Sequence, residues 1–222
     1  MDSDERRRAI VMAAVPLFAR RGFAGTTTRE LAAAAGVSEA LLFRHFPSKQ
    51  SLYHEILALG CEGDPALEKL ATLPASTRTL VSIVRFMVRR FVLGCEIERR
   101  ELDLRMRLVA HSFLEDGAYA RELFAAICPR VVPLFTASLA AAQAAGDLAP
   151  VPGSGANQFW FAQHIAAMMA FAFLPKDGCV PYEGGIEQVV EEASDFILRA
   201  IGMNELMIAA SRDQTTLLPA AE

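Results

Sequence analysis

The sequence lacks any cluster of residues that would mark a metal site or a catalytic centre. Its four cysteines, Cys61, Cys95, Cys128 and Cys179, are widely scattered and form no CxxC or Cys/His pattern, so neither zinc binding nor a disulfide framework is expected. A nucleophile elbow, an HExxH motif and a glycine-rich phosphate loop are also missing, and Cys95 and His111 have no evident triad partners. We therefore expect no catalytic residue, no metal and no cofactor.

A long hydrophobic run and a secretion signal are lacking as well. The uncharged apolar run from Ile165 to Pro175 is too short for a transmembrane helix, which needs about 20 residues. The first residues, MDSDERRR, contain acids and no following apolar stretch, which is unlike a signal peptide. Together with the scattered cysteines, these features predict a protein of the reducing cytoplasm without a membrane partner.

Charge is present but unevenly distributed. The 222-residue chain is 53% hydrophobic and 22% charged, which is typical of a soluble globular protein, and its net charge is −4. Residues 1–55 carry eight Lys and Arg against six Asp and Glu, whereas the remainder carries fourteen against twenty. The basic excess therefore lies in the N-terminal segment, which is weak evidence for a nucleic-acid partner when taken alone.

Residues 26–49 contain the start and stop signals of two short helices. Thr27 and Glu30 have the spacing of a capping box, and Gly36 is suited to the left-handed turn that ends a helix. Ser38 can cap a second helix over about residues 39–46, which Pro47 ends. Two short helices joined by a glycine-containing turn predict a helix-turn-helix, whose second helix can lie in the major groove of DNA.

The motif and its neighbours also carry a specific pattern of residues. The pattern comprises Phe18, Arg21-Gly22-Phe23, Thr26-Thr27, Leu31-Ala32, Ala35-Gly36-Val37-Ser38, Phe43-Arg44-His45-Phe46 and Ser48-Lys49. It resembles the N-terminal signature of the TetR family of bacterial transcriptional regulators. The resemblance covers about the first fifty-five residues, and beyond them only the length and helical character of the chain resemble the family.

Eleven residues are candidates for contacts with DNA. Thr27 and Thr28 can place hydroxyl or N–H groups on phosphates, Lys49 and His45 can donate to phosphates, and Arg29 can reach a base or a phosphate. The resemblance implies that Phe43, His45 and Lys49 touch the backbone, and that Glu39, Ala40 and Leu41 face bases. The full set is Thr27, Thr28, Arg29, Ser38, Glu39, Ala40, Leu41, Phe43, Arg44, His45 and Lys49.

Four of these residues leave alternatives open. Phe43 can be a core anchor, because it lacks the hydroxyl of the tyrosine usual in the family. Leu41 offers only apolar contact, for example to a thymine methyl group, and Glu39 repels phosphates but can accept from a cytosine amino group. For Arg44, a solvated charge and a DNA contact are equally good interpretations. The operator sequence therefore stays open.

The rest of the chain has helical periodicity and no strand-like alternation, so we predict an all-α fold. Helices are expected at residues 77–100, 102–114, 118–145, 156–174 and 182–201, with a kink or split at Pro129 and Pro133 and a connection over residues 64–76. The resemblance implies an N-terminal three-helix domain (1–55) that contains the helix-turn-helix. It also implies a larger helical effector-binding and dimerisation domain (56–210), and we expect a flexible tail (211–222).

The last predicted helix has one continuous apolar face. Core packing and dimerisation both explain this pattern, and dimerisation is favoured because helix-turn-helix modules usually read two half-sites as symmetric dimers. The resemblance implies an interface of four helices, formed by the last two long helices of each subunit. The residues assigned to it are Val189, Val190, Ala193, Phe196, Ile197 and Ile201.

The larger domain is rich in aromatic residues and methionine. Most of these residues are expected to be core, but the resemblance implies an effector pocket among the helices, in which a few polar groups orient the ligand. The pocket candidates are Phe86, Arg90, Met106, His111, Phe124, Trp160, His164 and Met168. The sequence thus predicts a homodimeric repressor that a largely apolar small molecule releases from a palindromic operator. A DNA-binding dimer without an effector, or an all-α enzyme or carrier of apolar ligands, are the alternatives.

Overall fold

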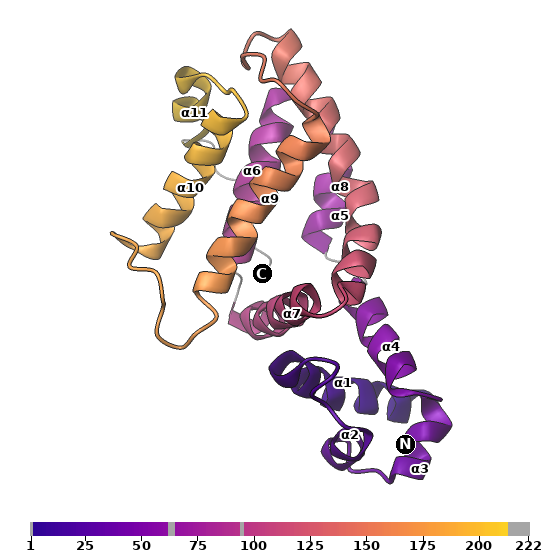
Figure 1. Cartoon of the computed structure of the whole chain (residues 1–222). Helices are drawn as coiled ribbons and strands as arrows, with labels where there is room; N and C mark the ends of the chain where they lie inside the picture. The colour runs from indigo at the N-terminus through magenta and orange to yellow at the C-terminus, as the bar shows by residue number, and fades with distance from the viewer. Residues whose placement is uncertain (1, 62–64, 94–95, 213–222) are drawn as a thin grey trace. The chain divides into compact units, whose positions relative to one another are not determined.

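The computed structural model of the chain describes residues 2–61, 65–93 and 96–212 (Figure 1). In these residues all regular structure is helical, apart from one isolated β-bridge between Leu148 and Met203. The predicted all-α fold is therefore confirmed. The helices are α1 (Ser3–Arg21), α2 (Thr28–Ala34), α3 (Glu39–His45), α4 (Lys49–Cys61), α5 (Pro65–Ala71), α6 (Thr77–Val92), α7 (Glu96–Leu114), α8 (Ala118–Ala144), α9 (Gly155–Ala172), α10 (Ile186–Ala200) and α11 (Glu205–Arg212).

The chain divides into two compact units. The first unit contains residues 1–62 together with 100–127, and the second contains residues 63–99 together with 128–222. The first unit is thus larger than the predicted N-terminal domain, because part of α7 and the start of α8 pack with it. The ring of Tyr119 lies 6.1 Å from that of Tyr53, and Glu122 is 2.9 Å from His54.

The core of the first unit is formed where α1 meets α2 and α4. Ile10 and Phe18 of α1, Leu31 of α2, Phe46 and Leu52 are each at most 1% exposed. The ring of Phe18 packs edge-on against Tyr53 of α4 with 5.0 Å between the ring centres. This core fixes the position of α2, and α3 packs in turn on α2.

Helix α6 is central to the second unit, since both α9 and α10 pack against it (Figure 1). Leu80, Ile83, Val84 and Val88 of α6 are at most 1% exposed. The start of α6 is held by Thr77, whose hydroxyl donates to Oδ2 of Asp147 at 2.6 Å. The amphipathic pattern of α6 therefore serves to bury one helix between two others.

Several predicted boundaries of helices differ from those observed. The predicted helix 77–100 is interrupted, because α6 ends at Val92 and α7 begins at Glu96, and the predicted helix 182–201 begins only at Ile186. The expected connection over 64–76 contains α5. Helix α11 was not predicted, and it includes Ser211 and Arg212 of the expected tail; residues 213–222 lie outside the described residues.

Helix α8 continues through both of its prolines. Pro129 and Pro133 lie inside one helix that runs from Ala118 to Ala144, so the helix is not split. The buried residues Val131, Phe135 and Leu139 recur at a spacing of four and hold its inner face against the unit. Helix α8 is also long and apolar enough to cross a membrane. By itself this is weak evidence for a membrane span, because core helices of soluble proteins can have the same length and composition. The expected absence of a membrane partner stays a prediction.

Candidate DNA-binding site

The two helices of the predicted motif begin with the caps that their sequence indicates. The Thr27 hydroxyl accepts from the backbone N–H of Glu30 at 3.3 Å, and Oε2 of Glu30 accepts from the N–H of Thr27 at 3.0 Å. The Ser38 hydroxyl accepts from the N–H of Leu41 at 3.2 Å and starts α3. Between the helices Gly36 has a φ of 64°, which is the left-handed turn expected of a glycine.

Helix α3 turns one side to the core and the other to solvent. Leu42 is 2% exposed, and the buried ring of Phe46 follows the helix. Glu39, Ala40 and Arg44 are exposed, and Phe43 is 43% exposed. Phe43 is therefore not a core anchor, and the outer side of α3 is free to contact a partner in the single chain.

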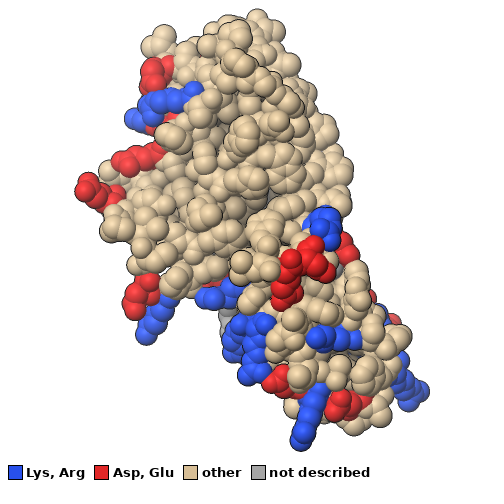
Figure 2. Space-filling view, in the orientation of Figure 1, with Lys and Arg blue, Asp and Glu red and all other residues tan. Residues whose placement is uncertain are grey.

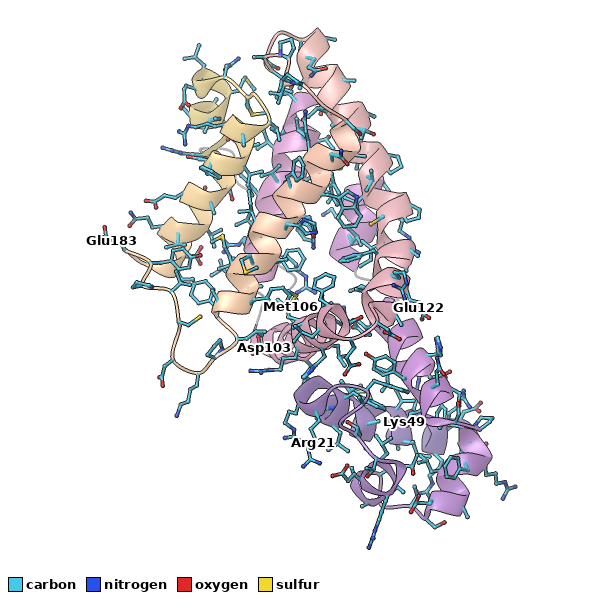
Figure 3. All side chains as sticks on the ribbon, in the orientation of Figure 1. Arg21, Lys49, Asp103, Met106, Glu122 and Glu183 are labelled. Carbon is cyan, nitrogen blue, oxygen red and sulfur yellow. The ribbon has the colours of Figure 1, made fainter. Side chains whose placement is uncertain are left out.

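Lys49 anchors the loop that precedes α2. Its Nζ donates to the carbonyl oxygens of Phe23 at 2.7 Å and Thr26 at 2.9 Å, and it lies 4.2 Å from the centre of the Phe23 ring (Figure 3). Two of the three ammonium protons are thus used within the chain, and one remains for an outside acceptor. Lys49 therefore holds the loop that leads into α2, and its remaining N–H group can still donate to a partner outside the chain.

Arg7 is a residue of this site that the sequence did not indicate. Its Nε and Nη2 donate to the Glu55 carboxylate at 3.0 and 2.9 Å, while Nη1 donates to the carbonyl oxygen of His45 at 2.6 Å. The guanidinium also lies 4.2 Å from the centre of the Phe46 ring. Arg7 thus joins α1, the end of α3 and α4, and it holds α3 in place through its last carbonyl group.

The Arg7–Glu55 pair predicts a dependence of stability on pH. The hydrogen bond from Arg7 holds the pKa of Glu55 below its ordinary value of 4.5. This pKa is lower in the folded state than in the unfolded state. The pair therefore stabilises the folded protein at pH values above 4.5, and this stabilisation is lost as the pH falls through the folded pKa. Glu55→Gln is therefore expected to cost up to about 1 kcal/mol at neutral pH and progressively less at acid pH, where protonation of Glu55 weakens the pair.

Urea unfolding of the wild type and of Glu55→Gln at neutral pH and at acid pH measures this difference. Glu68→Gln on α5 removes a second exposed carboxylate and serves as the control. If Glu55→Gln is equally destabilising at both pH values, the residue acts through packing and not through its charge.

All eleven predicted DNA contacts lie in the first unit, on α2, α3 and the start of α4. Thr28, Leu41, His45 and Lys49 are half-buried, and the other seven residues are exposed. One contact joins the two helices, since the Thr28 hydroxyl donates to Oε2 of Glu39 at 3.0 Å. The structure therefore places the predicted residues on neighbouring elements with exposed polar groups.

Comparison with known proteins agrees with this geometry. The family model described as bacterial regulatory proteins of the tetR family matches residues 10–56, which span most of α1, all of α2 and α3, and the first half of α4. The chain is a member of the TetR family. The repressor KstR2 of Rhodococcus jostii is 37% identical over 82 residues, which are 30% of this chain and 40% of that protein. The regulator RutR of Escherichia coli is 42% identical over 52 residues, 23% of this chain and 24% of RutR.

Solved structures of TetR-family regulators share the fold over nearly the whole chain. A TetR-family protein from Rhodococcus RHA1 has a TM-score of 0.65 and 20% identity, covering 92% of this chain and 100% of that one. AibR, solved with isovaleryl coenzyme A and operator DNA, has a TM-score of 0.64 and 20% identity, covering 86% of this chain and 97% of AibR. By sequence, however, this TetR-family chain spans less than half the length of the curated relatives quoted above.

The predicted effector residues of this TetR-family chain are not all inside the protein. His164 is exposed and Met168 is 65% exposed, because the inner face of α9 is formed by other residues such as Ala166 and Met169. In the single chain these two residues therefore face outward, and their assignment to an effector pocket stays a prediction. The remaining candidates are divided between the units, with Met106, His111 and Phe124 in the first and Phe86, Arg90 and Trp160 in the second.

Four of the six predicted dimer residues are covered within the single chain. Val189, Val190, Ile197 and Ile201 are each at most 6% exposed in the single chain, because α10 packs that face on α6. They are core residues and are not available to a second subunit. Ala193 is half-buried, and Phe196 is 61% exposed.

Helix α9 has an exposed apolar face whose residues were not among the predicted dimer contacts. Phe161 is 64% and Met168 65% exposed, and they lie on the same side of the helix as His164. Helix α9 contains no Asp, Glu, Lys or Arg, so its outer face is as uncharged as its inner one. A helix that is apolar on all sides is normally covered on all sides, and this signal could have pointed to the exposed residues of α9 from the sequence.

Proposed function

We propose that this TetR-family chain is a cytoplasmic, homodimeric transcriptional repressor whose operator binding is controlled by a largely apolar small molecule. The observation that carries the proposal is the exposed outer side of α2 and α3 on a rigid frame. These two helices are short and have little stability of their own. They are held by the caps at Thr27 and Ser38, by the hydrogen bonds of Lys49 to the loop before α2, and by the hydrogen bond of Arg7 to the end of α3. A rigid pair of helices with exposed polar side chains is what readout in the major groove requires.

DNA contacts are assigned to the same eleven residues of α2, α3 and α4. Residues at the ends of the helices, such as Thr27 and Lys49, position the protein on phosphates, whereas Glu39, Ala40 and Leu41 face bases. Figure 2 shows Lys and Arg interspersed with Asp and Glu over the first unit, and a further group of both signs at the left edge of the second. On the face shown, cations and acids are interspersed, so contacts with phosphates are assigned to individually placed cations.

The dimer is proposed to form through α9 and α10. Phe161 and Met168 of α9 and Phe196 of α10 are exposed in the single chain, and both helices pack on α6. Figure 2 shows a broad face of the second unit with few charged side chains. Exposed apolar patches of this kind mark protein–protein contacts, and two-fold symmetry would then present two copies of α3 to the two halves of a palindromic operator.

Control by a small molecule is proposed on two grounds. Residues 77–174 are rich in Phe and Met, which suits an apolar ligand. The similar protein AibR was solved with isovaleryl coenzyme A and with operator DNA, so both kinds of partner occur in a protein of this fold. A ligand can shift the protein between two states only by its differential affinity, typically about 1–3 kcal/mol.

Footprinting on the DNA upstream of the chain's own gene tests the proposal. A protected palindromic site is expected, and its half-sites should lie about 34–36 Å apart or a multiple of that distance. Apolar compounds that raise the melting temperature should then release the site. No protected site would contradict DNA readout, and stabilising compounds that leave DNA affinity unchanged would contradict control by an effector.

Operator binding is expected to weaken steeply with salt, and Lys49→Ala is expected to reduce that dependence. Loss of one phosphate contact should lower the slope of log affinity against log salt by about 1 and weaken all sequences about equally. Loss of the loop anchor adds to the weakening without changing the slope. Lys69→Ala on α5 removes the same charge far along the chain and should change neither quantity. An unchanged slope in Lys49→Ala would show that this ammonium serves only the loop.

A further inference from the structure

Thr28 and Glu39 meet across the turn of the helix-turn-helix. The Thr28 hydroxyl donates to Oε2 of Glu39 at 3.0 Å, and each residue is the first of its helix. Neither side chain is needed as a cap, because Thr27 caps α2 and Ser38 caps α3. Capping therefore does not account for this pair.

Glu39 is an acid on a face proposed to approach DNA. Its side chain is exposed, and among the described residues it forms no ion pair; the hydroxyl of Thr28 is its hydrogen-bond partner. A carboxylate near phosphates weakens binding unless it gains a specific interaction, because DNA carries one charge per about 1.7 Å. If this face binds DNA, the repulsion must be offset by a hydrogen bond from a donor group of the DNA to the Glu39 carboxylate.

The bases differ in what they offer to such a group. An ionised carboxylate only accepts hydrogen bonds, and Thr28 occupies one of its two oxygens. In the major groove guanine and thymine present acceptors, and adenine presents an acceptor beside its donor, whereas cytosine presents the N4 amino donor. Cytosine is therefore the base edge that suits a carboxylate held in this way.

The geometry points to Glu39, oriented by Thr28, as the residue that selects a cytosine in each half of the operator. This inference rests on the proposed function and adds to it the identity of one base. The Thr28 hydrogen bond restricts the rotamers of Glu39, so less freedom is lost when the second oxygen meets N4 of cytosine. At that position cytosine is expected to be preferred about tenfold over the other bases.

Selection of bound sequences from a randomised double-stranded DNA library, with the full chain, tests the inference. Glu39→Gln should move the preference at one position from cytosine to adenine, because a glutamine amide pairs with N6 and N7 of adenine. Thr28→Val keeps the shape of the side chain and removes the donor. It should retain cytosine but reduce the discrimination by about two- to threefold. Asp4→Asn, which removes another exposed acid of the first unit, should raise affinity evenly and leave base preference unchanged.

The possible failures are distinguishable. Glutamine can still accept from Thr28, so a purely structural tie between α2 and α3 predicts no change of base preference in Glu39→Gln. An enriched operator whose bases are unaffected by that substitution overturns the inference and leaves the proposed function intact. If Thr28→Val discriminates between cytosine and the other bases as well as the wild type does, Thr28 does not position Glu39. A wild-type chain that enriches no sequence overturns the proposed function, and this inference with it.

Discussion

A Phe196→Glu variant is expected to be a folded monomer that no longer binds operator DNA. Phe196 is 61% exposed on α10, so in the single chain a carboxylate at this position stays in water and has little effect on folding. In the proposed dimer the same carboxylate would be buried against a second subunit, where an unpaired charge is costly. Since one chain carries one copy of α3, a monomer can contact only one half-site.

The size of the effect follows from symmetry. In a two-fold dimer each substitution occurs twice, and a well-packed aromatic residue in an interface contributes about 2 kcal/mol or more. The dissociation constant of the dimer should therefore rise by about three orders of magnitude. Light scattering over a range of protein concentrations measures this change, and circular dichroism checks that the helices are retained.

Two further variants make the prediction specific. Met168→Glu on α9 should have the same effect, because Met168 is 65% exposed on the other helix of the proposed interface. Leu206→Glu on α11 is the matched control, since Leu206 is 84% exposed but lies on neither α9 nor α10. If Phe196→Glu and Met168→Glu both remain dimeric, the interface lies elsewhere. If Leu206→Glu alone dissociates, it lies on α11.

Ile197 shows what periodicity in the sequence cannot distinguish. It belongs to the same apolar face of α10 as Phe196 in the sequence pattern, yet it is 1% exposed because that side of α10 packs on α6. Ile197→Glu would bury a charge in the fold and unfold the second unit, so it does not test dimerisation. A periodic pattern reveals which residues are apolar, but not whether the chain itself or a partner covers them.

The helix-turn-helix could be predicted because its signals are local. The capping box of Thr27 and Glu30, the left-handed Gly36 and the cap at Ser38 lie within twelve residues of one another, and each acts on the adjacent backbone. The residues that hold these helices in place act over longer separations. Arg7 bonds Glu55, which is 48 residues away, and Lys49 bonds Phe23, which is 26 away. No spacing in the sequence reports such contacts.

Helix α11 was missed for a related reason. It has eight residues, which is too short to be stable in isolation. Tertiary contacts hold it instead, since Ile208 is 1% exposed and Arg212 bonds Asp195 of α10. Asp195 is a charged residue of α10, but it is only 1% exposed and it receives α11.

Asp195→Ala is therefore expected to lower the free energy of unfolding of the second unit by about 3–5 kcal/mol. Oδ1 of Asp195 accepts from Nη2 of Arg85 at 3.0 Å, and Oδ2 accepts from Nε of Arg212 at 2.9 Å. The Arg85 side chain is only 12% exposed, so without Asp195 its charge stays poorly hydrated. Urea unfolding followed by the fluorescence of Trp160, the single tryptophan and a residue of the second unit, measures the loss at a fixed protein concentration.

Glu191→Ala is the matched control, because Glu191 pairs with the same guanidinium. Its side chain is 49% exposed, so water can replace it, and the expected cost is about 1 kcal/mol or less. The difference between the two losses in unfolding free energy measures the effect of burying the carboxylate, because both variants remove a carboxylate beside Arg85. Equal losses would mean that the arginine is hydrated and that burial of Asp195 has no energetic consequence.

The double variant Arg85→Met with Asp195→Leu separates charge from packing. Apolar side chains of similar volume remove both buried charges together, and such replacements are often neutral or stabilising by about 1–4 kcal/mol. The change also removes the Nε atom of Arg85, which is buried without a hydrogen-bond partner among the described residues. Arg212 is 55% exposed and can return to water. Stability close to that of the wild type is therefore expected. A double variant as unstable as Asp195→Ala would mean that the shape of the aspartate, and not compensation of the Arg85 charge, holds α6, α10 and α11 together.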